Sequence, residues 1–192
     1  MGKAKKRIAT IFTVGAILVI IILLFYMDIS KRKNNEELEA AEGREQAVKL
    51  LERDLETNYP ETPREVAKYY SSITEALYSG LEDQDVEALA IKILELYDEE
   101  FLQNNTQEKY LTDLYSEIAA WNKAERTITN FLLVNDELET RETVDGKEYA
   151  TVYVSYIIME RGKVSEVRKY LLRKNEEGNW KILGWETLPK EE

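Results

Sequence analysis

The first segment of the chain is one uninterrupted apolar run, which covers residues 8–27 and contains no charged side chain. Twenty helical residues, at about 1.5 Å each, span a hydrocarbon core of roughly 30 Å. The run is longer than the apolar part of a typical signal peptide, and it ends at Phe25, Tyr26 and Met27 without a small-residue cleavage site. These features predict a transmembrane helix that is not cleaved.

Basic residues flank this run on both sides, with four in residues 1–7 and three in residues 31–33. A short basic N-terminus normally stays in the cytoplasm. We therefore expect a single-pass protein of the cell membrane. Residues 1–7 would form a cytoplasmic basic tail, and the large C-terminal part would lie outside.

The segment after the apolar run is polar and helical in pattern, and residues 28–59 are expected to form a charged linker or stalk helix. Its apolar positions Val48, Leu51 and Leu55 are expected to dock on the following domain. A coiled-coil dimer is the alternative, but charged residues interrupt every possible apolar seam. The extracytoplasmic domain is expected at residues 60–188, followed by a charged tail at 189–192.

Helical periodicity dominates the first half of that domain. Thr62 and Glu65 form a capping box around Pro63, which suits the first helical position. The apolar stripe that follows predicts a helix up to about Gly80. Two more helices are expected, one from about Asp83 to Leu102 and one that begins with a capping box at Asn105 and Glu108.

After about residue 126 the apolar period changes from 3.6 to two, which predicts strands. The dipeptide Asp145-Gly146 is the strongest hairpin signal, and turns are also expected at Arg161-Gly162 and Glu177-Gly178-Asn179. An antiparallel meander of about four strands follows. The fold class is therefore α+β, with a helical layer packed on one face of a curved antiparallel sheet.

Two resemblances extend this interpretation. The order of elements, with the closing run Gly178-Asn179-Trp180-Lys181-Ile182-Leu183-Gly184-Trp185, resembles the cone-shaped nuclear transport factor two-like fold, also called SnoaL-like or cystatin-like. Residues 53–66 with Tyr69 and Tyr70 resemble a stretch in a family of membrane-anchored proteins of gut Clostridia, classed as a domain of unknown function. The second resemblance implies a membrane anchor and a Gram-positive source, and it implies no activity.

Composition restricts the possible chemistry. The chain has no cysteine and no histidine, which excludes disulfides, thiolate metal sites, a cysteine nucleophile and the Ser-His-Asp triad. Residues 1–33 hold seven Lys/Arg and one Asp, which leaves 19 Lys/Arg and 36 Asp/Glu, a net charge of −17, in residues 34–192. A domain with this charge is not expected to bind nucleic acid, because that binding needs clustered positive charge.

Three groups of residues could carry chemistry. The first is an acidic cluster that could bind calcium but lacks the spacing of a calcium loop, so helix capping is the favoured interpretation: Glu82, Asp83, Asp85 and Glu87. The second is expected at the C-terminus of the second helix as a solvated face near Lys92 or Lys109: Asp98, Glu99 and Glu100. The third contains eight of the twelve tyrosines, which could line the mouth of the cone or simply fill the core, the latter being favoured: Tyr69, Tyr70, Tyr78, Tyr97, Tyr110, Tyr115, Tyr153 and Tyr156.

None of these groups is assigned as a catalytic, cofactor-binding or metal-ligating site, and no cofactor is expected. The leading hypothesis is a non-catalytic protein-interaction module of the cell envelope. The alternative is a ligand-binding or sensing domain that uses the interior of the cone, and an enzyme is the least favoured. A filled interior would favour the interaction module, whereas an apolar pocket with a few converging polar groups would favour ligand binding.

Overall fold

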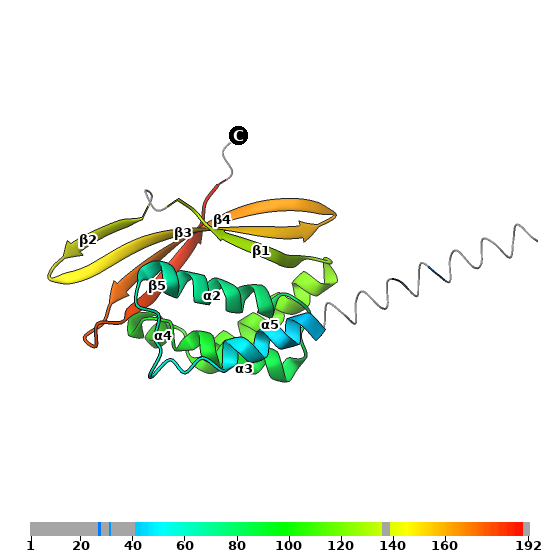
Figure 1. Cartoon of the computed structure of the whole chain (residues 1–192), viewed down its shortest axis with the longest axis horizontal. Helices are drawn as coiled ribbons and strands as arrows, with labels where there is room; N and C mark the ends of the chain where they lie inside the picture. The colour runs from blue at the N-terminus through cyan, green and yellow to red at the C-terminus, as the bar shows by residue number, and fades with distance from the viewer. Residues whose placement is uncertain (1–26, 28–30, 32–40, 136–138, 190–192) are drawn as a thin grey trace, which may run out of the picture. The chain divides into compact units, whose positions relative to one another are not determined.

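The computed structural model describes residues 27, 31, 41–135 and 139–189. The chain divides into two compact units, Met1–Ala41 and Glu42–Glu192, and the helices and strands named here belong to the second. Helices come first and strands follow (Figure 1). The elements are α2 (Pro63–Leu77), α3 (Asp83–Leu94), α4 (Glu99–Asn104), α5 (Gln107–Lys123), β1 (Thr127–Leu133), β2 (Thr140–Val144), β3 (Lys147–Glu160), β4 (Gly162–Lys174) and β5 (Trp180–Thr187).

The strands form one antiparallel sheet in the order β1-β3-β4-β5, and β2 also pairs with β3. Strand β1 pairs with the C-terminal half of β3 and β2 with its N-terminal half. Five strands therefore occupy four positions in the sheet. The predicted hairpin at Asp145-Gly146 is confirmed, since Val144 pairs with Lys147 and both turn residues have a positive φ.

The helical layer covers one face of this sheet, with α2 lying along the strands (Figure 1). Alternate residues of β3 point to that face, and Val152, Val154, Tyr156 and Ile158 are buried as their period-two pattern predicts. The helices contribute fully buried residues such as Ile73. The predicted α+β class, with helices packed on an antiparallel sheet, is thus confirmed.

The first helix of the domain starts as predicted. The Thr62 side chain accepts a hydrogen bond from the Glu65 amide, and the Glu65 side chain accepts one from the Thr62 amide. Pro63 lies at the first position of α2. The third predicted helix begins one residue later than expected, because Thr106 rather than Asn105 caps α5 by accepting from the Lys109 amide.

The prediction of one continuous second helix from Asp83 to Leu102 is wrong. Helix α3 ends at Leu94, and the chain then forms a parallel bridge between Tyr97 and Ile182 of β5. The Ile182 amide donates to the Leu96 carbonyl, and the Asp98 amide donates to the Ile182 carbonyl, both at 2.8 Å. These bonds use backbone groups that a continuous helix would need. The apolar side chains continue through the break, so their periodicity does not reveal it.

The segment before α2 packs against the domain. It is helical over residues 42–51, and Ala47 and Leu55 are buried. The Tyr69 hydroxyl donates to the Leu50 carbonyl at 2.6 Å, and the Tyr59 hydroxyl donates to the Trp180 carbonyl at 2.8 Å.

The docking position predicted for Val48 is wrong, because Val48 is 47% exposed and its neighbour Ala47 faces the core instead. No helix within the described ranges is long and apolar enough to cross a bilayer. The predicted span at 8–27 lies outside those ranges except for Met27.

Candidate functional site

A cavity of about 340 Å³ lies between the helical layer and strands β4 and β5. Helices α2 and α5 supply two of its walls at helical spacing, through Tyr70, Thr74 and Leu77 from α2 and Tyr110 and Leu114 from α5. Tyr70, Leu77 and Leu114 belong to the apolar stripes that were predicted to pack against the sheet, whereas Thr74 and Tyr110 lie beside those stripes. The stripes do face it, and they leave a pocket between them.

Aromatic rings form much of the cavity wall. Tyr97 stacks on Phe101 with ring centroids 3.9 Å apart, and it meets Tyr70 edge-on at 5.7 Å. The hydroxyl groups of Tyr70 and Tyr97 are 2.7 Å apart and share a hydrogen bond. Trp185 of β5 also lines the cavity and is 43% exposed. The pocket is thus mainly apolar and contains a few polar groups, which is the usual composition of a small-molecule site.

The structure separates the eight tyrosines that the sequence singled out. Four of them line the cavity: Tyr70, Tyr78, Tyr97 and Tyr110. Tyr156 lies in the core, where its hydroxyl bonds those of Ser71 and Tyr170, each at 2.7 Å. Tyr69 lines a different groove, while Tyr115 and Tyr153 are only partly buried.

Two charged residues also line the cavity and were not predicted. Arg168 of β4 is only 6% exposed, and its Nε donates to Glu166 at 2.7 Å. Its guanidinium carbon lies 4.7 Å from the centroid of the Tyr156 ring and 4.6 Å from that of Trp185, so both rings provide cation–π contacts. Glu117 of α5 is exposed.

One sequence signal could have identified Arg168. Every second residue of β4 pairs with a buried residue of β3 and therefore points to the same inward face of the sheet. These residues occupy positions 164, 166, 168, 170 and 172. Arg168 is therefore a cation at an inward position between the inward-facing Glu166 and Tyr170. Charged residues are almost never buried unless they are paired, so such a position marks a site that needs a partner.

Burial keeps the tyrosine hydroxyls of this region neutral. It raises the pKa of Tyr70 to about 12 and the pKa of Tyr97 and Tyr170 well above the usual value. The same cause raises the pKa of Tyr110. At neutral pH these groups act as uncharged donors and acceptors, so the fixed charges of the cavity are Arg168 and Glu117.

Alkaline titration tests this burial. The pKa of an unfolded tyrosine is about 10, and a higher pKa in the folded state means that burial of the neutral hydroxyl contributes to stability. This contribution is fully present below about pH 10. For Tyr70 this contribution is lost as the pH rises from about 10 toward about 12. We expect tyrosinate absorbance to rise in two steps, the second coinciding with loss of the near-ultraviolet circular dichroism. If all tyrosines titrate in one smooth step while the fold stays intact, the predicted burial of these hydroxyls is wrong.

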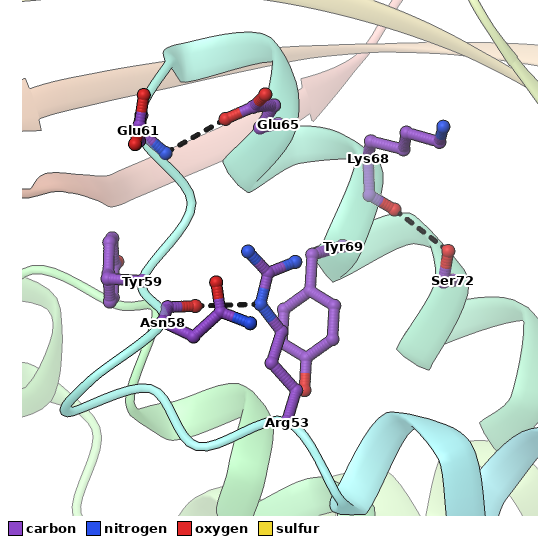
Figure 2. A pocket seen from close by; sticks show the side chains of 8 residues that line it. All are labelled: Arg53, Asn58, Tyr59, Glu61, Glu65, Lys68, Tyr69 and Ser72. Atoms are coloured by element: carbon purple, nitrogen blue, oxygen red, sulfur yellow. Dashed lines mark hydrogen bonds between the residues drawn. The ribbon is translucent and has the colours of Figure 1, made fainter.

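A second hollow of about 550 Å³ lies beside α2 and is polar (Figure 2). Arg53 lies in its middle, 4.9 Å from the centroid of the Tyr69 ring, and its Nε donates to the Asn58 carbonyl at 2.8 Å. The Glu65 carboxylate in the same wall belongs to the cap of α2 and accepts from the Glu61 amide at 2.9 Å. These contacts tie the segment before α2 to that helix, which is a structural role.

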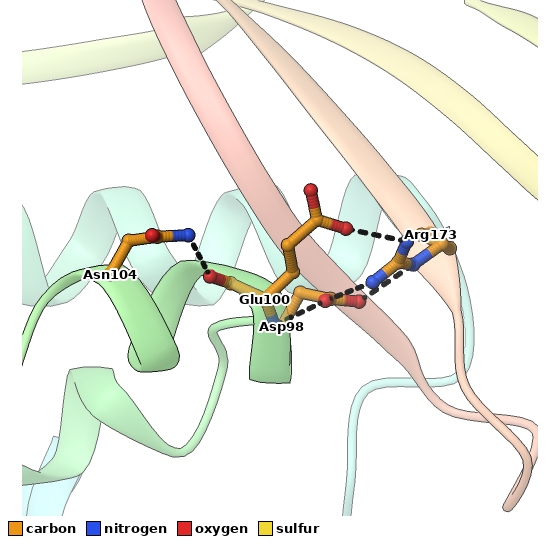
Figure 3. Close-up of polar contacts among 4 residues, drawn as sticks. All are labelled: Asp98, Glu100, Asn104 and Arg173. Atoms are coloured by element: carbon orange, nitrogen blue, oxygen red, sulfur yellow. Dashed lines mark hydrogen bonds and ion pairs between the residues drawn. The ribbon is translucent and has the colours of Figure 1, made fainter.

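Asp98, Glu99 and Glu100 were predicted at a helix C-terminus, and this placement is wrong. They begin α4, where the Asp98 side chain caps the Glu100 amide at 2.9 Å. The partner of Asp98 and Glu100 is Arg173 of β4 rather than Lys92 or Lys109. It donates from Nε and Nη2 to Asp98 and from Nη1 to Glu100 at 3.0 Å (Figure 3).

The acidic cluster at the start of α3 pairs with an arginine from the helical segment that precedes α2. Arg44 forms an ion pair with Glu82, and its Nε lies 3.7 Å from Asp85. Glu82 occupies the cap position without making a side-chain cap bond, whereas Asp83 and Asp85 lie in the first turn, where carboxylates oppose the helix dipole. Across the described ranges, no three carboxylates converge to hold a metal ion.

Comparison with known proteins places the chain in a family without assigning it a function. No curated protein matches the chain. A family model described as Domain of unknown function (DUF6715) matches residues 1–185, which confirms the expectation of a family of that kind. Because this match covers far more than half of the sequence, the chain belongs to the DUF6715 family.

Proposed function

We propose that this protein is a membrane-anchored domain that binds a small molecule in the cavity between its helices and its sheet, without catalysing a reaction. The observation that carries the proposal is the open cavity of about 340 Å³, which has aromatic walls and a few polar groups. A filled interior is expected of a pure interaction module, whereas an apolar pocket with a few polar groups is expected of a ligand-binding domain. By that criterion the cavity favours ligand binding.

The enzyme hypothesis gains no support from the cavity. A catalytic acid or base would be a titratable group held inside the pocket and tuned by burial. Among the described residues, Glu117 is the only carboxylate that lines the cavity, and it is exposed. The chain has no histidine or cysteine to act in its place. Binding without turnover is therefore the proposed activity.

The resemblance to the nuclear transport factor two-like fold agrees with this proposal. Helices α2 to α5 lie on one face of an antiparallel sheet, and the cavity lies between the two layers (Figure 1). The closing strand β5 supplies Trp185 to the cavity wall. We propose that the fold belongs to that class and that its interior serves as the binding site.

A panel of three small molecules that differ only in the head group tests cavity binding: phenylbutyrate, phenylbutanol and phenylbutylamine. We expect calorimetric titration of the full chain in lipid nanodiscs, corrected with empty nanodiscs, to show saturable binding of at least one member. Leu114→Trp should abolish it, because Leu114 is a buried residue of the cavity wall. The matched control Leu132→Trp should not affect it, because Leu132 is 58% exposed and belongs to β1.

Two results would count against ligand binding. Binding that survives Leu114→Trp would lie outside the cavity. If no member of the panel binds, and a defined protein is recovered from solubilised membranes at low salt, the envelope-interaction function replaces ligand binding. That partner should be basic, because the net charge of residues 34–192 is −17.

The proposed location is outside a cell membrane, with residues 8–27 as the anchor and the N-terminus in the cytoplasm. Support comes from the length of the uncharged run and from the basic residues before it. External protease should digest residues 34–192 on intact protoplasts. Protection until lysis, or a mature N-terminus near Asp28, would contradict this topology.

A further inference from the structure

The cavity contains a cation with unused hydrogen-bonding capacity. Arg168 has five N–H donors, and its Nε uses one of them on Glu166 at 2.7 Å. Among the described residues, none accepts a hydrogen bond from Nη1 or Nη2. Glu166 pairs with the charge of this guanidinium through Nε alone. Nη1 and Nη2 therefore remain available to a further acceptor, and a carboxylate is the group that their geometry suits.

The position of the guanidinium is well defined. The Tyr156 ring and the Trp185 ring both lie within 5 Å of its central carbon, at 4.7 and 4.6 Å. The bond from Nε to Glu166 fixes a third direction. Because the side chain is held before any ligand arrives, little rotamer entropy would be lost when an acceptor binds. A planar fork of this kind matches a carboxylate with two parallel hydrogen bonds.

Within the part of the chain that the structure describes, no side chain accepts from these two amino groups. Glu117 lines the same cavity and has the right charge, but it is exposed and forms no ion pair with Arg168 in the described structure. The hydroxyls of Tyr70 and Tyr97 bond one another, which leaves at least one of their two protons for another acceptor. The polar groups in the buried part of the cavity thus offer donors, whereas its walls are aromatic and aliphatic.

We propose that the ligand is an organic acid with an apolar body and a single carboxylate, which accepts hydrogen bonds from Nη1 and Nη2 of Arg168. This inference rests on the proposed ligand-binding function and names the class of ligand. The apolar body packs against the stacked pair Tyr97 and Phe101 and against Leu114. An amine head group is disfavoured because it would be placed beside the guanidinium.

The same three-member panel tests this assignment in the full chain in nanodiscs. We expect phenylbutyrate to bind at least about tenfold more tightly than phenylbutanol or phenylbutylamine, as hydrogen bonds to charged groups allow. Arg168→Gln should remove that advantage, so that phenylbutyrate binds no more tightly than phenylbutanol. Arg53→Gln is the matched control, because Arg53 also packs on a tyrosine but lies in the polar hollow beside α2, and it should retain the full preference.

The possible failures are distinguishable. If phenylbutanol or phenylbutylamine binds as tightly as phenylbutyrate, the cavity is a ligand site and the carboxylate assignment is wrong. If no member binds, the ligand-binding function fails, and the assignment fails with it. Should Arg168→Gln lose the native circular dichroism, the pH dependence in the unaltered chain decides instead. Phenylbutyrate affinity should fall as the pH drops through the pKa of the free acid while phenylbutanol affinity stays constant, and parallel pH profiles would overturn the assignment.

Discussion

Replacing Trp180 with alanine is expected to lower the free energy of unfolding by about 3–5 kcal/mol, as large aromatic truncations in cores do. Trp180 is the first residue of β5 and is only 4% exposed. Arg141 and Lys174 lie within cation–π distance of its ring, at 5.8 and 5.6 Å. Truncation removes these contacts and leaves a cavity under the sheet. Chemical denaturation followed by circular dichroism measures the effect.

The matched control for this change is Trp185→Ala in the same strand. Trp185 is 43% exposed, so its truncation removes less buried surface and should cost less than about half as much. Both side chains belong to β5, and both variants change tryptophan to alanine. Equal losses, or a loss below about 1 kcal/mol for Trp180→Ala, would mean that β5 pairs in a different register.

Removing the Asp98 carboxylate should have an effect of similar size, about 3–5 kcal/mol for Asp98→Ala. The Asp98 side chain is 5% exposed and the Arg173 side chain 15%, so the substitution leaves a largely buried guanidinium without its main partner. The same change removes the cap of α4, where Asp98 accepts from the Glu100 amide. Thermal and chemical unfolding of Asp98→Ala against the unaltered chain measures the loss.

The control for this prediction uses the second carboxylate on the same arginine. The Glu100 side chain is 60% exposed, and exposed ion pairs contribute at most about 1 kcal/mol. Glu100→Ala should therefore be nearly neutral. Adding Arg173→Met to Asp98→Ala should recover part of the stability, because the unpaired charge is removed. Equal effects of Asp98→Ala and Glu100→Ala would show that burial does not determine the strength of this ion pair.

Local signals in the sequence predicted the features that depend on neighbouring residues. The capping box of Thr62 and Glu65 and the turn at Asp145-Gly146 need only a few adjacent side chains, and both lie where they were expected. The burial of alternate β3 residues follows from period two alone.

Features that depend on distant residues were missed. The break between α3 and α4 arises from pairing with Ile182, which lies more than 80 positions further along the chain. The pairing partner of Asp98 is likewise distant in sequence, so a helix C-terminus was predicted where a helix begins. The cavity depends on how closely α2, α5 and β4 approach one another, which residue spacing does not encode. Arg168 was missed because the tyrosines were considered without the strand alternation that places it beside them.

The bridge between Tyr97 and Ile182 has a consequence for self-association. Strand β5 forms one outer edge of the sheet, and exposed edges can recruit strands from other copies and start aggregation. At Ile182 both backbone groups are already bonded to Leu96 and Asp98, so this part of the edge offers no free donor or acceptor to a foreign strand. The opposite edge is divided between β1 and β2, and a register irregularity lies at Ile128 and Asn130. These two features interrupt both edges of the sheet, which disfavours the addition of a regular strand from another copy.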